Sequence, residues 1–385
     1  MHARFALTLP SDVTLLQEPL ALFDECMALT LLSTEQGAFG AARRAFGIPA
    51  KPTDSHGFAG RLSIEVTGAV PADRIAAIGL LSGLGDVAVW GGPLGCTTLL
   101  LEALAGRPAA SLTSLSFRSG MLAARHVDML LPLTALRRLD LRGSTIGAEG
   151  AARLAGGLRA LTDLDLGNNS IGNRGVAAIV AELPALTRLD VSYNNIDDSG
   201  FSAVAHLPEL RDLRVSWNNH GNRTYTHALP ACVRLERLDL AFCVTPPPLA
   251  AFLGAMPRLA WLDVSNSGVS SKHAFALTQL KHLARLDVSV NAIDAHGARV
   301  ISGIETLTDL DISWNNVCHL GATHLTLLTR LSKLDIGSNA VLDCGAMELA
   351  CMPSLLYLDV RRNRLSAGGA AWLRGARRAD LTLRM

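Results

Sequence analysis

The sequence predicts an α/β repeat array in which short parallel strands alternate with short helices. Three observations predict it. The pattern L-x-x-L-x-[LVI] returns at intervals of 24 or 25 residues from Leu112 to Leu355, an asparagine follows most copies, and a glycine then opens a helix-like run. Because a single unit leaves its apolar edge uncovered, neighbouring units must stack to bury it.

Each copy begins with a predicted strand, since the L-x-L alternation has the period of two that is typical of a strand with one buried face. Weaker copies begin at Leu62 and Leu84, and Leu381-x-Leu383 predicts a last strand.

Two further columns complete the unit. A buried asparagine amide at the ninth position can satisfy backbone groups where the chain turns. These asparagines are Asn169, Asn194, Asn218, Asn291, Asn315, Asn339 and Asn363, whereas Cys243 and Ser267 interrupt the column. The glycines that open the helix-like runs are Gly150, Gly175, Gly200, Gly297, Gly321, Gly345 and Gly369.

Composition excludes several classes of protein. The chain has 385 residues, of which 49% are hydrophobic and 18% charged, so it can bury a large core and is not of the disordered type. A net charge of +1 argues against binding nucleic acid through bulk charge. The sequence lacks a run of ~20 apolar residues, so we expect no membrane span.

We also expect no metal, no cofactor and no enzyme activity. The seven cysteines are an odd number without a CxxC pair, which favours buried, reduced thiols over disulfides or a zinc site. Phosphate-binding, zinc-protease and serine-hydrolase motifs are absent from the sequence.

Residues 1–57 lack the repeat and carry helix-like patterns over Leu15–Leu32 and Gly37–Phe46. We therefore divide the chain into an N-terminal helical segment, 1–57, and a repeat array, 58–385. The segment is either a cap that shields the first coil or an element that binds an adaptor protein.

The side chains between the leucines point away from the core. The position before the third apolar residue is aspartate in nine copies and Arg214 in the tenth: Asp140, Asp165, Asp190, Asp239, Asp263, Asp287, Asp311, Asp335 and Asp359. Strands lie ~4.8 Å apart, so these charges repel one another. Cations two residues earlier alternate with other residues, and we expect them to form an ion-pair lattice with most of the aspartates.

Aromatic residues gather on the same face. In three successive copies the residue directly before the asparagine column is aromatic: Tyr193, Trp217 and Phe242. Trp314 occupies the same position further along the chain. Exposed aromatic and arginine side chains on a rigid face are typical of binding hot spots. The alternative is that the rings lie flat over neighbouring backbone. The predicted protein-binding residues are Arg188, Asp190, Tyr193, Asp212, Arg214, Trp217, Arg237, Asp239, Phe242, Trp261, Asp263 and Trp314.

The pattern LxxLxLxxNxL over residues 112–365 resembles the leucine-rich-repeat family. That resemblance implies a curved solenoid with a parallel sheet on the concave face, short helices on the convex face, and a protein partner on the concave face. The G-A-x-x-L-A runs look like the GALA type, which occurs in effectors that plant-pathogenic bacteria inject into host cells.

The resemblance leaves two functions open. The first is a non-enzymatic, monomeric scaffold of the bacterial cytoplasm, or one delivered into a host cell by a specialised secretion system. The second is an F-box-like effector adaptor that recruits a host ubiquitin ligase through residues 1–57. Neither requires nucleic acid or a membrane.

Overall fold

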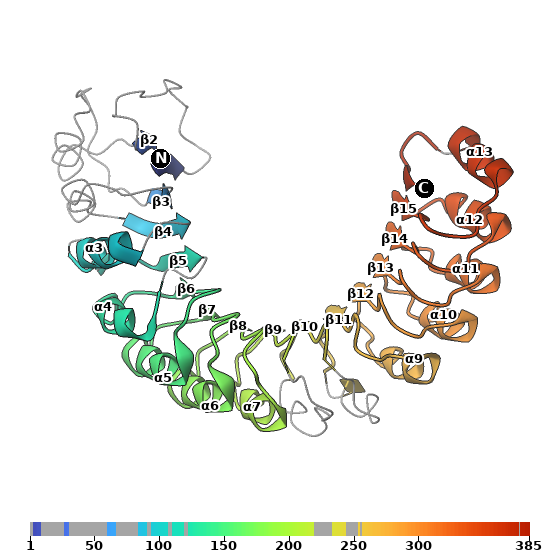
Figure 1. Cartoon of the computed structure of the whole chain (residues 1–385). Helices are drawn as coiled ribbons and strands as arrows, with labels where there is room; N and C mark the ends of the chain where they lie inside the picture. Colours follow the sequence, from blue (N-terminus) through green and yellow to red (C-terminus); the bar gives the residue numbers. More distant parts are fainter. Residues whose placement is uncertain are drawn as a thin grey trace. The chain divides into compact units, whose positions relative to one another are not determined.

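The computed structural model describes residues 3–8, 27–30, 60–66, 84–90, 94–106, 110–118, 122–218, 233–243, 253–254, 256–376 and 378–385. The chain divides into two compact units, Met1–Asn194 and Asn195–Met385, and each is described by itself. Figure 1 shows both units with their elements labelled.

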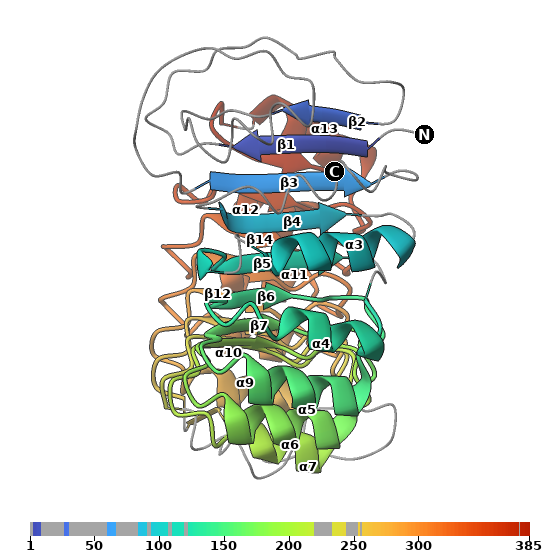
Figure 2. The same ribbon diagram turned by 90° about the vertical axis from the view of Figure 1, so that its left-hand side faces the viewer.

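The first unit is a sheet flanked by helices. Its strands are β1 (Ala3–Thr8), β2 (Met27–Thr30), β3 (Gly60–Val66), β4 (Leu84–Trp90), β5 (Ser114–Arg118), β6 (Arg138–Asp140), β7 (Asp163–Asp165) and β8 (Arg188–Asp190). From β3 to β8 each strand pairs in parallel with the next, and Figure 2 shows β3 to β7 stacked one above another. The helices are α3 (Leu94–Leu104), α4 (Val127–Leu130), α5 (Gly147–Gly157) and α6 (Gly172–Glu182), with a 3-10 turn at Ala124–His126.

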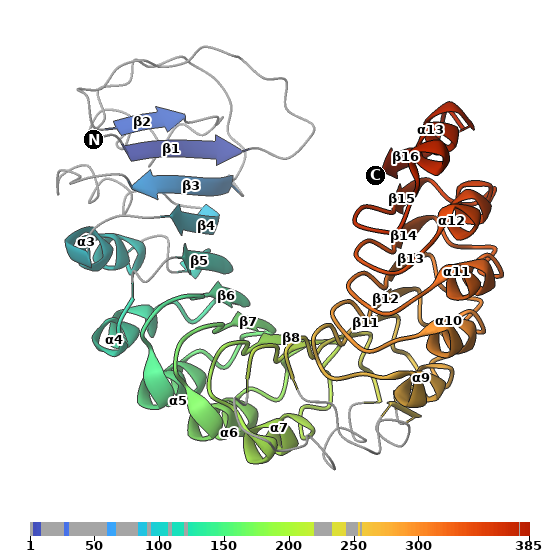
Figure 3. The same cartoon turned by 45° about the vertical axis from the view of Figure 1, so that its right-hand side comes forward.

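The second unit repeats the same alternation in shorter elements. Its strands are β9 (Asp212–Arg214), β10 (Arg237–Asp239), β11 (Trp261–Asp263), β12 (Arg285–Asp287), β13 (Asp309–Asp311), β14 (Lys333–Asp335), β15 (Tyr357–Asp359) and β16 (Thr382–Arg384), all paired in parallel. The helices are α7 (Asp198–Val204), α9 (Ser271–Leu277), α10 (Ala295–Ile301), α11 (His319–Leu325), α12 (Asp343–Ala350) and α13 (Ala367–Ala376). In Figure 3 strands β11 to β16 follow one edge of this unit and helices α9 to α13 the other.

The repeat leucines form the core between these two edges. Leu286, Leu310 and Leu334 pair in register across β12, β13 and β14, and each is at most 2% exposed. Burying one leucine contributes ~1.5–3 kcal/mol, so each short strand is held by its leucines and by its neighbours rather than by its length. The predicted repeat array of parallel strands and short helices is confirmed.

The glycine column is explained by close packing of one helix on the next. A Cβ added to Gly321, in α11, would lie 2.7 Å from Val317 Cγ1 and 3.1 Å from the Cα of Ala295. The neighbouring backbone occupies the space that a side chain would need, so a larger residue would push the coils apart.

The asparagine column joins successive coils through backbone groups. Asn315 Nδ2 donates to the carbonyl oxygens of Val288, Ile312 and Ser313 at 2.9, 3.2 and 3.0 Å. Its Oδ1 accepts the N–H of Ile293 at 2.8 Å. One amide therefore satisfies its own turn and two groups of the preceding coil, as predicted for this column.

The column continues through one of its two interruptions. Ser267 Oγ donates toward the carbonyl oxygens of Leu240 and Ser265, both at 2.9 Å, and accepts the N–H of Cys243 at 3.3 Å. A hydroxyl thus takes the place of an amide with the same neighbours. Cys243, at the other interruption, places its thiol 3.5 Å from the carbonyl oxygen of Val215.

The helices predicted in residues 1–57 are wrong where the structure describes them. Met27–Thr30, within the predicted helix Leu15–Leu32, form β2, which pairs in parallel with Ala3–Thr8. Apolar periodicity does not distinguish a strand from a helix in so short a run, and backbone pairing decides the outcome. The predicted helix Gly37–Phe46 lies outside the described residues.

The prediction of buried thiols holds only in part. Cys243 is buried and Cys318 half-buried, but Cys344 and Cys351 are exposed. Both exposed thiols lie at α12, on the helix edge, where the repeat pattern does not require an apolar residue.

Asn315→Ala is expected to lower the free energy of unfolding by about 3 kcal/mol, because it leaves the N–H of Ile293 without a partner and removes the hydrogen bonds to three carbonyl groups. Urea unfolding followed by circular dichroism measures the change. The adjacent Asn316→Ala is the matched control, since this side chain is exposed. Equal effects of the two substitutions would contradict the role of the column.

Candidate protein-binding surface

Three columns of side chains cover the strand edge of each unit, and we call this surface the strand face. The first column is the first residue of each strand from β6 to β15, and the aspartate column is the last. The third, here called the ring column, lies three residues after the aspartate column. Its members are Gly143, Asn168, Tyr193, Trp217, Phe242, Asn266, Val290, Trp314, Ser338 and Arg362. All the predicted binding residues fall on these columns, Arg188, Asp190 and Tyr193 in the first unit and the other nine in the second.

The aspartates are bound mainly by the turn that follows each strand. Each of the nine accepts, through Oδ1, the backbone N–H of the residue two positions later, at 2.9 to 3.1 Å. A carboxylate that bonds its own backbone in this way shapes a tight turn. The main structural role of the aspartate column is therefore to form the turn that ends each strand.

The predicted ion-pair lattice over most of the aspartate column is wrong. Cations of the first column pair instead with anions of the same column on adjacent strands: Arg138 and Arg188 with Asp163, Arg237 with Asp212, and Lys333 with Asp309. In the aspartate column, Asp190 pairs with Arg142 and Asp359 with Arg361, while Arg214, the cation of this column, pairs with Asp212 of the first column. The turn hydrogen bonds draw the aspartates toward the loop and away from the first column.

The second unit consequently carries a run of aspartates without a cation. Among the described residues no cation lies within 4.0 Å of Asp263, Asp287, Asp311 or Asp335. Burial raises the pKa of Asp287 to about 7, with further contributions from the charges of Asp263 and Asp311. Burial likewise raises the pKa of Asp263, and it raises that of Asp335 to about 6.

The aromatic residues of the second unit stand on the strand face as predicted. The rings of Trp217 and Phe242 are stacked, with centroids 3.5 Å apart and an angle of 20° between their planes. The guanidinium of Arg237 lies 4.8 Å from the centroid of Trp261 and within ion-pair distance of Asp212. Phe242 is 37% exposed and Trp314 54%. Rings beside an arginine have the composition that is typical of a binding hot spot.

The backbone conformation of the ring column was not predicted from the sequence. All ten of its members have positive φ, including Trp217, Phe242 and Val290 at 55 to 56°. This region costs an ordinary residue roughly 1–2 kcal/mol, and it is least suited to β-branched side chains. The N–H of Trp217, Phe242 and Val290 donates to a carbonyl of the next coil at 2.8 to 3.0 Å, so stacking of the coils enforces the strained turn. Residue type gave little signal, because only Gly143, Asn168 and Asn266 are of a kind that favours this region.

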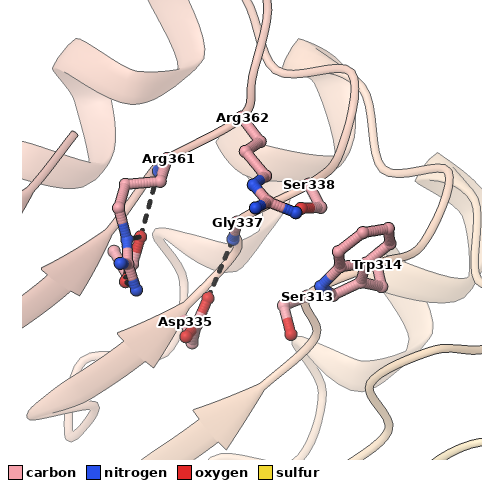
Figure 4. A pocket seen from close by; sticks show the side chains of 8 residues that line it. Ser313, Trp314, Asp335, Gly337, Ser338, Arg361 and Arg362 are labelled. Carbon is pink, nitrogen blue, oxygen red and sulfur yellow. Dashed lines mark hydrogen bonds and ion pairs between the residues drawn. The ribbon is translucent and has the colours of Figure 1, made fainter.

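A pocket of about 290 Å³ opens on the strand face of the second unit. It is lined by Ser313, Trp314, Asp335, Gly337, Ser338, Asp359, Arg361 and Arg362, and Figure 4 shows it from close by. Of the predicted binding residues only Trp314 belongs to it.

The comparisons with known proteins bear on this arrangement. Two family models, both described as leucine-rich repeat, match residues 159–219 and 133–155. The chain carries leucine-rich repeats. These matches cover the repeats around β6 to β9, and the same register continues to β16 in the structure. No curated protein has a sequence that matches the chain.

Solved structures of other proteins are similar to this chain. An internalin from Listeria monocytogenes is similar with a TM-score of 0.56 and 16% identity, over 84% of this chain and 86% of that one. A leucine-rich-repeat protein from Leptospira interrogans has a TM-score of 0.42 and 15% identity, over 82% and 92%. A plant peptide hormone receptor, solved in complex with a peptide, has a TM-score of 0.44 and 17% identity, over 83% and 53%.

Two absences apply only to the part of the chain that the structure describes. There, no group of three or more histidine, cysteine, aspartate or glutamate side chains is arranged to hold a metal ion. No helix among the same residues is long and apolar enough to cross a membrane.

Asp287→Asn is expected to raise the free energy of unfolding at pH 7.5 by about 2 kcal/mol. The folded carboxyl has a pKa of about 7 against 3.8 for the ordinary group, so the folded state binds the extra proton and its stability falls as the pH rises from 4 to 7. The amide can still accept the N–H of Ser289 without carrying a charge. Urea unfolding at pH 4 and at pH 7.5 should show the variant and parent converging at the lower pH. Asp309→Asn, which breaks the pair with Lys333, is the control and should bring no gain.

Val290→Asn is expected to stabilise the fold by about 0.5–1 kcal/mol, because asparagine tolerates positive φ better than a β-branched residue. Val290 is 45% exposed, so little buried area is lost. Val233→Asn is the control, since Val233 is 53% exposed and has no positive φ. A loss of stability at position 290 in thermal unfolding would show that the turn is not strained.

Proposed function

We propose that this chain is a non-enzymatic scaffold that holds a protein partner against its strand face. The observation that carries the proposal is the pair of stacked rings, half-buried Trp217 and exposed Phe242, on the same face as Arg237 and Trp261. Exposed aromatic clusters on monomeric surfaces usually mark interaction sites, and binding energy concentrates in such anchors.

The character of the surface supports a protein rather than a small substrate. The second unit presents its rings, arginines and aspartates over many coils, spaced by the strand separation of ~4.8 Å. An extended partner can contact several coils at once, as a rigid repeat surface favours. The leucine-rich repeat is a scaffold typical of protein–protein interaction, and this chain shares its fold with the internalin structure.

The bacterial origin, the GALA type and the division at residue 57 remain part of this proposal. The Gly-Ala openings of α10 to α12, at Gly297, Gly321 and Gly345, support the GALA type. In the adaptor alternative, residues 1–57 would recruit a host ubiquitin ligase. The strands β1 and β2 in that segment give no support to it, because the predicted element was helical.

Trp217→Ala combined with Phe242→Ala is expected to weaken partner binding by ~2 kcal/mol or more, which is about thirtyfold in affinity. The partner is first isolated by affinity capture and mass spectrometry, and its dissociation constant is then measured by isothermal titration calorimetry. Thermal unfolding of the variant verifies that the fold is retained.

Phe275→Ala combined with Leu327→Ala is the matched control, since both side chains are more than 60% exposed but belong to the helix side. If the control pair weakens binding and the ring pair does not, the partner binds the helix edge and the proposal is wrong. A chain lacking residues 1–57 that still binds the same partner would exclude the adaptor alternative for that partner.

A further inference from the structure

The pocket beside Trp314 lies where one coil has a glycine, Gly337, at a position that carries a side chain in the neighbouring coils. Position 337 is glycine, whereas the same position in the three preceding coils is serine, at Ser265, Ser289 and Ser313. A Cβ on Gly337 would lie 3.1 Å from Asp335 Oδ1 and 3.3 Å from the carbonyl oxygen of Arg361, so it would fill the floor. In Figure 4 the indole of Trp314 stands on one side of this space and the carboxylate of Asp335 on the other.

Asp335 is the charged group that the pocket leaves to a ligand. Its Oδ1 accepts the N–H of Gly337 at 2.9 Å, and no cation in the described part of the chain comes within ion-pair distance. Arg361 is already bound to Asp359, with Nε 2.9 and 3.0 Å from its two oxygens. The guanidinium of Arg362 lies over the Trp314 ring, 5.4 Å from its centroid.

The strip of strands that leads to the pocket is acidic, whereas the lining itself holds two aspartates and two arginines: Asp335, Asp359, Arg361 and Arg362. Strands β11 to β14 place five aspartates on the strand face against two cations, Arg285 and Lys333, and Lys333 is paired with Asp309. A strip of negative charge on a protein surface of low dielectric attracts cations and repels anions. Within the lining, Arg361 is held by Asp359, which leaves Asp335 and Arg362 as the charges open to a ligand. The acidic strip beside them favours a cation over an anion.

We infer that this pocket receives a lysine or arginine side chain of the partner protein. The cationic head pairs with Asp335 and the aliphatic stem packs against the Trp314 ring, which is the way such amphipathic side chains use an aromatic wall. This inference rests on the proposed function, since it names the chemistry that the strand face recognises in its partner.

The test uses the whole chain labelled with 5-fluorotryptophan and two acetylated, amidated probe decapeptides, (Gly-Lys)5 and (Gly-Arg)5. The ¹⁹F resonance of Trp314 is assigned with Trp314→Phe. We expect that resonance to shift and saturate with at least one basic probe, and to stay unchanged with (Gly-Glu)5. A response to the acidic peptide alone would overturn the inference in favour of an anion site.

Asp335→Asn is expected to weaken binding of the basic probe by about tenfold or more, since the variant removes the charge and keeps an acceptor for Gly337. Asp165→Asn is the matched control. Asp165 occupies the same column in the first unit and also has a raised pKa, but it belongs to a coil without a ring at the pocket position. Equal affinities of the Asp335 variant and the parent would overturn the inference.

Gly337→Ala tests the shape of the pocket independently of charge. The added methyl should weaken probe binding by about fivefold or more, because it occupies the floor beside Asp335. Gly167→Ala is its matched control, with Cβ neighbours at 3.2 to 3.5 Å in the first unit, and it should leave binding unchanged. If Gly337→Ala fails to fold, the Asp335 comparison still decides.

Binding should also strengthen as the pH rises from 5 to 7.5, because a cation pairs with the ionised form of Asp335. Its pKa is about 6, raised by burial and by Asp311 and Asp359 and lowered by Arg361, while Tyr357 stays neutral over this range. Affinity that is independent of pH would contradict a pair with Asp335.

The two proposals fail separately. If the probes ignore Asp335 while the ring pair Trp217 and Phe242 still governs binding of the captured partner, only the pocket inference is lost. If the ring pair has no effect but the probes bind through Asp335, the pocket stands and the placement of the partner on the rings is wrong.

Discussion

The hydrogen bonds that cross from one coil to the next are the interaction on which this structure depends. Each three-residue strand is too short to persist alone, and the turn after it would leave buried backbone groups without partners. The Asn315 amide, repeated at the equivalent positions, satisfies its own turn together with groups of the preceding coil. Because every coil relies on its neighbour, order in the array is a property of pairs of coils rather than of any single one.

The same bonds explain the strand face. Residues of the ring column have positive φ, and the backbone N–H of Trp217, Phe242 and Val290 reaches the next coil. The aspartate oxygen at the end of each strand fixes the turn that leads there. The energetic costs are a strained backbone and a row of neighbouring carboxylates. Those costs fall on the exposed edge, where rings and charges are available to another molecule, while the leucines at the core stay buried.

The repeat and its strands were predictable because their cause is periodic. Leucines at fixed spacing identify the buried face, and the asparagine and glycine columns identify the turn and the helix contact. The helix predicted at Leu15–Leu32 was wrong at Met27–Thr30, since a short apolar run has no period that separates strand from helix. The ion pairs were predicted wrongly for another reason. Sequence spacing indicates that cations lie near Asp287, but it does not show that the backbone N–H of Ser289 binds the carboxylate of Asp287. The pocket was missed because it arises from an absent side chain at Gly337, which a search for chemical groups overlooks.

The ring column has a consequence for how such a surface can diversify. Its backbone bonds involve only the main chain, so Trp217, Val290, Ser338 and Arg362 occupy equivalent places with the same local geometry. A substitution there changes the side chain that a binding partner meets without changing the backbone that carries it. The chemistry of this surface can therefore change by substitution in one coil at a time, while the repeat architecture stays the same.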